Sequence, residues 1–104
     1  REVTEVAVGV LIDKEGRFLM ASRPQGKPYA GWWEFPGGKL EVGETVLEAL
    51  RREYAEELGV TVKIASPWFV FEREYPHAYV RLHFCRITDW EGDRSPEKVK
   101  FFVV

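Results

Sequence analysis

The chain has 104 residues, of which 45% are hydrophobic and 31% charged, and its formal net charge is −2. This length and composition fit one globular domain and exclude a disordered or fibrous protein. The slightly acidic balance argues against nonspecific nucleic-acid binding, which usually requires a basic patch. The sequence has no run of about 18 apolar residues to span a membrane, and its single cysteine, Cys85, cannot form an internal disulfide. We therefore expect a cytoplasmic protein.

The first third of the chain predicts short strands joined by turns. Residues 3–12 are rich in Val and Ile, which is typical of a buried strand. The turn at residues 13–16 should return the chain as a second strand over 18–21, and we expect these two strands to pair as a hairpin. Two Pro and two Gly over residues 23–31 predict a loop, and a short strand is expected over 32–35.

One helix is predicted between residues 45 and 59. Thr45 and Glu48 have the spacing of a capping box, and Gly59 suits the position just after a helix. An apolar stripe at intervals of three or four residues runs between them, through Leu47, Leu50, Tyr54 and Leu58.

The rest of the chain predicts more strands, over residues 60–65, 69–74, 79–87 and 101–104. In the third of these, Val80, Leu82 and Phe84 alternate with other residues, and we expect their face to pack on a core. The layout indicates a mixed sheet with at least one covering helix.

The predicted helix carries a strip of carboxylates. Glu53, Glu56 and Glu57 fall within about 100° of arc on one helical face. One interpretation is a solvated acidic face, with Arg52 pairing to Glu48 and Glu56. The other is a site for a hard cation such as Mg²⁺, which prefers oxygen ligands.

The spacing around this strip favours the second interpretation. Five residues separate Gly38 from Glu44, and seven more separate Glu44 from the run Arg52-Glu53-Tyr54-Ala55-Glu56-Glu57-Leu58-Gly59-Val60. These 23 residues resemble the Nudix box, G-x5-E-x7-R-E-U-x-E-E-x-G-U, where U is a bulky aliphatic residue. Tyr54 departs from the pattern at the first U, and we expect a change of packing there rather than of chemistry.

The resemblance extends beyond the box. Residues 34–39, Glu-Phe-Pro-Gly-Gly-Lys, are similar to the segment that opens the box in the MutT-type branch. The resemblance implies the Nudix fold, an α+β protein (an α/β/α sandwich) in which the box helix covers one face of a mixed β-sheet. It also implies a single Nudix hydrolase domain over residues 1–104 that lacks the C-terminal helix usual in that branch, so a fused or partner domain could follow.

The resemblance implies a Nudix pyrophosphohydrolase that cleaves a nucleoside triphosphate to the monophosphate and pyrophosphate with metal-activated water. Glu53, Glu56, Glu57 and the carbonyl of Gly37 would hold Mg²⁺, with Mn²⁺ as an alternative. Arg52 would orient a box glutamate, Glu53 is a candidate general base, and Glu44 would support a metal through water. The substrate-binding candidates implied are Arg23, Phe35, Gly38 and Lys39, although Phe35 could be plain core and Lys39 a solvated loop residue.

The resemblance also implies a nucleotide substrate rather than a nucleic-acid polymer, and the branch points first to 8-oxo-dGTP or a related purine triphosphate. A glutamate that follows a Trp-Glu-Gly segment in that branch has a candidate counterpart in Glu97, but the family's Glu-Gly-Gln run is absent here. Two other functions remain open. One is hydrolysis of another nucleotide, such as a pyrimidine triphosphate, and the other is a non-catalytic nucleotide-binding Nudix domain of a larger protein.

Overall fold

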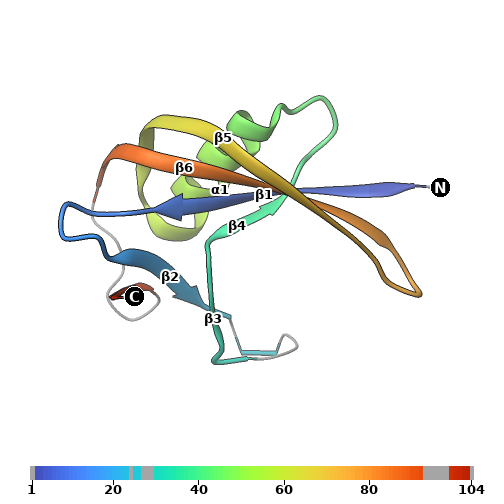
Figure 1. Ribbon diagram of the computed structural model, residues 1–104, viewed down its shortest axis with the longest axis horizontal. Coiled ribbons are helices and arrows are strands. Elements are labelled where there is room, and N and C mark those ends of the chain that lie inside the picture. The colour runs from blue at the N-terminus through green and yellow to red at the C-terminus, as the bar shows by residue number, and fades with distance from the viewer. Residues whose placement is uncertain (1, 24, 27–29, 93–98, 104) are drawn as a thin grey trace.

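The computed structural model describes residues 2–23, 25–26, 30–92 and 99–103 (Figure 1). Its elements are β1 (Val3–Leu11), β2 (Phe18–Ser22), β3 (Trp33–Glu34), β4 (Gly37–Lys39), α1 (Val46–Leu58), β5 (Thr61–Glu74), β6 (Tyr79–Glu91) and β7 (Val99–Phe102). No helix in the described part of the chain is long and apolar enough to cross a membrane.

The larger sheet has the strand order β4-β1-β6-β5. β1 and β6 run parallel, whereas β4 on β1 and β5 on β6 are antiparallel. The parallel pair joins segments far apart in the sequence, with Val6 opposite Leu82 and Gly9 opposite Cys85. The sheet is therefore mixed, as predicted.

The expected hairpin between the first two strands is wrong. β2 belongs to a second sheet of order β3-β2-β7, which lies below the larger sheet in Figure 1. A single bridge, between Ile12 and Phe18, joins it to the end of β1. The physical reason is that β6 pairs along the whole of β1, whereas β4 pairs with residues 6–8 and the Gly9 N–H donates to Pro36 O, so β2 meets only the end of the strand.

Other strand boundaries also differ from the prediction. The two strands expected over 60–65 and 69–74 form one continuous strand, β5, which passes through Pro67 with register shifts on either side. Proline is tolerated there because β5 is an edge strand and its missing N–H needs no partner. β6 continues to Glu91, β7 begins earlier than expected, and β4 was not anticipated.

The helix α1 forms as predicted. The Thr45 hydroxyl accepts a bond from the Glu48 N–H at 3.2 Å, and the Glu48 carboxylate accepts one from the Thr45 N–H at 2.8 Å. Gly59 ends the helix in the left-handed conformation at φ 68°, where glycine has no steric penalty. The two caps fix the ends of the helix and therefore the position of its acidic face.

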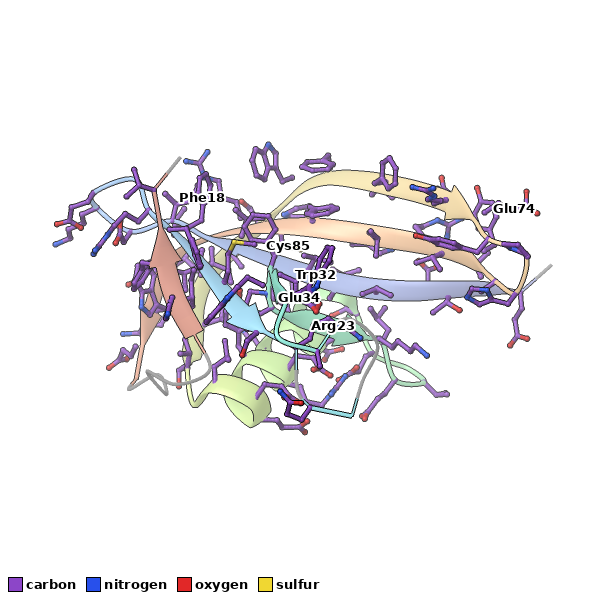
Figure 2. All side chains as sticks on the ribbon, turned by 90° about the horizontal axis from the view of Figure 1, so that it is seen from below. Phe18, Arg23, Trp32, Glu34, Glu74 and Cys85 are labelled. Atoms are coloured by element: carbon purple, nitrogen blue, oxygen red, sulfur yellow. The ribbon has the colours of Figure 1, made fainter. Side chains whose placement is uncertain are left out.

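The core lies between α1 and one face of the larger sheet. The helix contributes Ala49, Leu50, Tyr54 and Leu58, and the sheet contributes Ala7, Leu11, Cys85, Ile87 and others. The alternating face of β6 expected to enter the core does not do so, because Leu82 and Phe84 are only half-buried and line a groove instead. Beyond α1 the hairpin of β5 and β6 extends to a tip near Glu74, as Figure 2 shows.

Candidate active site

An open groove of about 1130 Å³ contains most of the predicted site residues. Its walls come from β1, the segment of β2, β3 and β4, the helix α1, and β6. The predicted residues that line it are Arg23, Phe35, Gly37, Gly38, Lys39, Arg52, Glu53 and Glu57. The fold thus brings Arg23 and residues 35–39 to the same groove as the acidic face of the helix, although they are separate in the sequence.

The two glycines of β4 allow this close approach. A Cβ on Gly38 would collide with the carboxylate of Glu53, so the missing side chain is what lets that carboxylate lie against β4. A Cβ on Gly37 would collide with the backbone carbonyl of Ala7 in the neighbouring strand. Gly38 therefore accommodates a functional side chain, whereas Gly37 accommodates the sheet itself.

Arg52 lies at the centre of the acidic cluster. Its Nε and Nη2 donate to the two carboxylate oxygens of Glu44 at 2.7 and 2.9 Å, and its Nη1 donates to Glu53 at 3.0 Å. Nη2 also donates to the backbone carbonyl of Lys39 at 3.1 Å. The bond from Arg52, followed by one from the Glu41 N–H, lowers the pKa of Glu44 from its ordinary 4.5 to about 2. Arg52 thus connects the helix to β4 and to the loop that precedes the helix.

The three predicted carboxylates are not equally placed. Glu53 and Glu57 line the groove, whereas Glu56 does not and lies beside Arg52, at 3.5 Å from Oε2 to Nη1. Glu48 closes the capping box and forms no pair with Arg52. The solvated-face interpretation is therefore correct for the pairing with Glu56 and wrong for Glu48.

Arg23 and Phe35 lie on the sheet side of the groove. Arg23 Nη1 donates to Glu34 Oε2 at 2.7 Å. The half-buried ring of Phe35 meets the ring of Phe18 edge to face, with 6.1 Å between centroids. Phe35 consequently belongs both to a small aromatic contact and to the groove wall. Lys39 is exposed at the groove, and Glu97 lies outside the described residues.

The comparison with protein families decides the assignment. The family model described as NUDIX domain matches residues 3–101 of this chain. The chain belongs to the Nudix family. The fold class and the family predicted from the box residues are thus confirmed.

Relatives of known activity place this Nudix chain in the MutT-type branch. It is 37% identical over 93 residues to the 8-oxo-dGTP diphosphatase of Proteus vulgaris, a match that spans 89% of this chain and 83% of the relative. It is also 36% identical over 85 residues to the CTP pyrophosphohydrolase of Escherichia coli, covering 82% of this chain and 63% of that protein. The chain is therefore a MutT-type Nudix pyrophosphohydrolase.

Solved structures agree with this assignment. The E. coli ORF135 protein superposes with a TM-score of 0.83 at 31% identity, covering 97% of this chain and 74% of that one. The MutT protein of Bacillus halodurans superposes with a TM-score of 0.77 at 31% identity, covering 95% and 67% of the two chains. These comparisons give no support to the alternative of a fused or partner domain at the C-terminus.

The donor chemistry of the Nudix site fits a hard cation. Within the residues the structure describes, no three acidic, His or Cys side chains are gathered into a formed metal cage. The groups available at the groove are nevertheless carboxylate oxygens of Glu53 and Glu57 and the backbone carbonyls of β4. All are hard oxygen donors. Because Gly38 has no side chain, the Glu53 carboxylate can lie against β4 at the groove wall.

Sequence reasoning missed several residues of the groove. Leu82 and Phe84 from β6 and Met20 from β2 form apolar wall, and Glu34 and Glu41 add carboxylates. Glu34 stands inside the quoted Glu-Phe-Pro-Gly-Gly-Lys segment, so a signal for it was available. Nothing local to Leu82 or Phe84 indicates which face of β6 the helix would cover.

Proposed function

We propose that this chain hydrolyses a nucleoside triphosphate to the nucleoside monophosphate and pyrophosphate in the presence of Mg²⁺. The leading candidate substrate is 8-oxo-dGTP or a related purine deoxynucleotide. The observation that carries the proposal is that one groove is lined both by the helix carboxylates Glu53 and Glu57 and by the cationic side chains of Arg23 and Lys39. Such a groove can bind a polyphosphate through metal ions held by the carboxylates and through its own cationic side chains.

The metal is assigned to the acidic side. Glu53, Glu56, Glu57 and the carbonyl of Gly37 would hold Mg²⁺, or Mn²⁺ in its place. When bound, the cation would supply Lewis-acid polarisation of the phosphate and a lowered pKa of water. Arg52 holds Glu53 in position through the 3.0 Å bond and ties Glu44 to the same cluster.

The remaining groove residues would bind the nucleotide. Arg23 and Lys39 suit the phosphates, because a guanidinium and an ammonium are the usual donors to phosphate oxygens. Phe35, Leu82 and Phe84 provide an apolar wall against which a base can lie. Glu53 is our candidate to accept the proton of the attacking water, because it is the carboxylate whose position is fixed on two sides, by Arg52 and by the backbone at Gly38.

A pyrimidine triphosphate is the second candidate substrate. Its support is the similarity to the E. coli CTP pyrophosphohydrolase, which is nearly as high as that to the 8-oxo-dGTP diphosphatases. A panel of 8-oxo-dGTP, dGTP, dATP and CTP, each assayed for pyrophosphate release, separates the two candidates by their kcat/KM values. Nucleotide binding without release of pyrophosphate from any of the four would indicate a non-catalytic domain instead.

The metal assignment is tested with the variant Glu57→Gln. It keeps the size of the side chain and removes the charge, and we expect activity to fall by at least a hundredfold. Glu48→Gln is the matched control on the same helix, because glutamine also closes a capping box. Removal of divalent cations with a chelator should abolish turnover and Mg²⁺ should restore it. Full activity in Glu57→Gln would overturn the assignment.

A further inference from the structure

The ion pair between Arg23 and Glu34 links the residue that follows β2 to β3, on the sheet side of the groove. Ala21 of β2 is opposite Glu34 of β3, and the chain closes beyond them with bonds from Arg23 N–H to Trp32 O at 2.8 Å and from Gly31 N–H to Arg23 O at 3.1 Å. Arg23 is therefore a diagonal neighbour of Glu34 on the same face, a spacing that long side chains can bridge. Figure 2 shows the two side chains beside each other, near Trp32.

The contact between them is directed. Nη1 of Arg23 lies 2.7 Å from Oε2 and 3.3 Å from Oε1 of Glu34, so one nitrogen of the guanidinium approaches both oxygens. Because the guanidinium is rigid and planar, this contact also helps to orient its remaining nitrogens. The side chains are about one-third and one-half exposed, at 32% and 45%, so the pair is open to the groove rather than sealed in the core.

Glu34 is not part of the cluster of carboxylates that pair with Arg52. The described ion pairs of Arg52 are with Glu41, Glu44, Glu53 and Glu56, and Glu34 is paired instead with Arg23, which follows β2. A carboxylate beside a groove that binds phosphates would repel the ligand, so its presence there indicates another role. Glu34 can have the role of orienting the arginine, because an arginine that is already ordered loses less conformational freedom when the ligand binds.

We propose that Glu34 is a positioning residue that holds the guanidinium of Arg23 in the orientation that binds the nucleotide. The inference rests on the proposed function, in which Arg23 contacts the substrate, and it adds the residue that acts through Arg23. Glu34 is not assigned a contact with the reacting atoms. Its removal should therefore weaken nucleotide binding and leave the chemical step unchanged.

The test is a double-mutant cycle on Arg23→Ala and Glu34→Ala, assayed with 8-oxo-dGTP, dGTP and CTP in the presence of Mg²⁺. Glu34→Ala should raise KM about threefold to tenfold and leave kcat within about twofold of the wild type. In the Arg23→Ala background the same substitution should change KM by less than about twofold, because there is no guanidinium left to orient. Glu34→Gln keeps an acceptor oxygen for Nη1 and should recover most of the loss.

Glu72→Ala is the matched control. Glu72 is also paired with an arginine, Arg81, directly across β5 and β6, at 3.2 Å and with side-chain exposures of 41% and 34%, and neither residue lines the groove. Its removal should lower the melting temperature about as much as Glu34→Ala does and should leave KM unchanged. An equal rise of KM in both variants would reduce the effect of Glu34 to general stability and would overturn the proposal.

The remaining outcomes separate this inference from the proposed function. Turnover by the wild type with additive effects of the two alanine substitutions overturns the positioning role alone. A fall in kcat with KM unchanged also overturns it, since it would place Glu34 in the chemical step. If no pyrophosphate is released, binding of each nucleotide is followed through the intrinsic tryptophan fluorescence, to which Trp33 in the groove wall contributes, and the cycle is repeated on Kd. Neither turnover nor binding of any of the three nucleotides would overturn the proposed function, and the inference with it.

Discussion

The hydroxyl of Tyr54 donates a hydrogen bond to the backbone carbonyl of Gly9 at 3.2 Å, across the interface of α1 and β1. A Cβ on Gly9 would lie only 2.5 Å from the phenol oxygen, so the absence of a side chain on the strand is what admits the ring. Tyr54 is fully buried, and this burial raises the pKa of its hydroxyl above its ordinary value, which keeps it a donor. Tyr54 occupies the box position where an aliphatic residue is usual, and Gly9 accommodates its larger ring.

Our first prediction concerns this pair. Gly9→Ala should lower the free energy of unfolding by about 1–3 kcal/mol, because it overfills a packed core. Tyr54→Leu alone should also destabilise, because it leaves a cavity and removes the donor to the Gly9 carbonyl. The double variant should be less destabilised than the sum of the two by at least about 1 kcal/mol, since leucine leaves room for the new methyl group. Urea unfolding of the four proteins measures the coupling, and strictly additive effects would contradict the fit we describe.

The second prediction separates the two glycines of β4. Gly38→Ala places a methyl group against the Glu53 carboxylate and should reduce turnover by about tenfold to a hundredfold with a small change in melting temperature. Gly37→Ala places it against the backbone of β1, which cannot move aside, and should destabilise the fold by about 2 kcal/mol or more. Thermal unfolding and pyrophosphate release are measured on both variants. The reverse pattern, with Gly38→Ala unstable and Gly37→Ala stable but inactive, would refute the distinction.

The comparison of sequence and structure shows which contacts are local. The helix and both of its caps were predictable because Thr45, Glu48 and Gly59 interact with residues only a few positions away. The pairing of the first strand was not, because its partners β4 and β6 are set by the whole sheet. For the same reason the alternation in β6 marked two faces without indicating that Cys85 and Ile87, rather than Leu82 and Phe84, would meet the helix.

The site residues also differ in whether local spacing or tertiary contacts determine their positions. The spacing of Glu53 and Glu57 placed them on one helical face, and the structure puts both in the groove. That Arg52 reaches Glu44 and the carbonyl of Lys39, rather than Glu48, depends on how the preceding loop lies over the helix. The pairing of Arg23 with Glu34 requires the antiparallel contact of β2 and β3, which no local pattern in residues 23–31 specifies.

The third prediction tests the capping box. Thr45→Ala removes the acceptor for the Glu48 N–H and should cost about 1 kcal/mol of stability. Thr61→Ala, at an exposed position at the start of β5, is the control and should change stability by less than about 0.5 kcal/mol. Chemical denaturation measures both. Equal effects at the two threonines would show that the cap contributes nothing beyond an ordinary threonine.

The fourth prediction concerns acid stability and the pair of Glu44 with Arg52. The pKa of Glu44 in the folded chain is about 2, below its ordinary 4.5, chiefly because Arg52 donates two hydrogen bonds to it. A group with a lowered folded pKa stabilises the native state above its ordinary pKa and loses that contribution as the pH falls toward the folded value. The stability from this pair should therefore be complete near pH 6 and should decline between about pH 4.5 and 2.

Glu44→Gln removes the titrating group and keeps a single acceptor oxygen for Arg52. The variant should be less stable than the wild type near pH 6, and the difference between the two should shrink as the pH is lowered toward 3. Both proteins should still lose stability in acid, because hydrogen bonds and ion pairs also lower the pKa of Glu5, through His83 and Arg81, and of Glu91, through Lys63. The prediction is tested by measuring the melting temperatures of both proteins from pH 6 to pH 3. A difference between the two melting temperatures that stays constant over this range would show that the ionised form of Glu44 is not what stabilises the cluster.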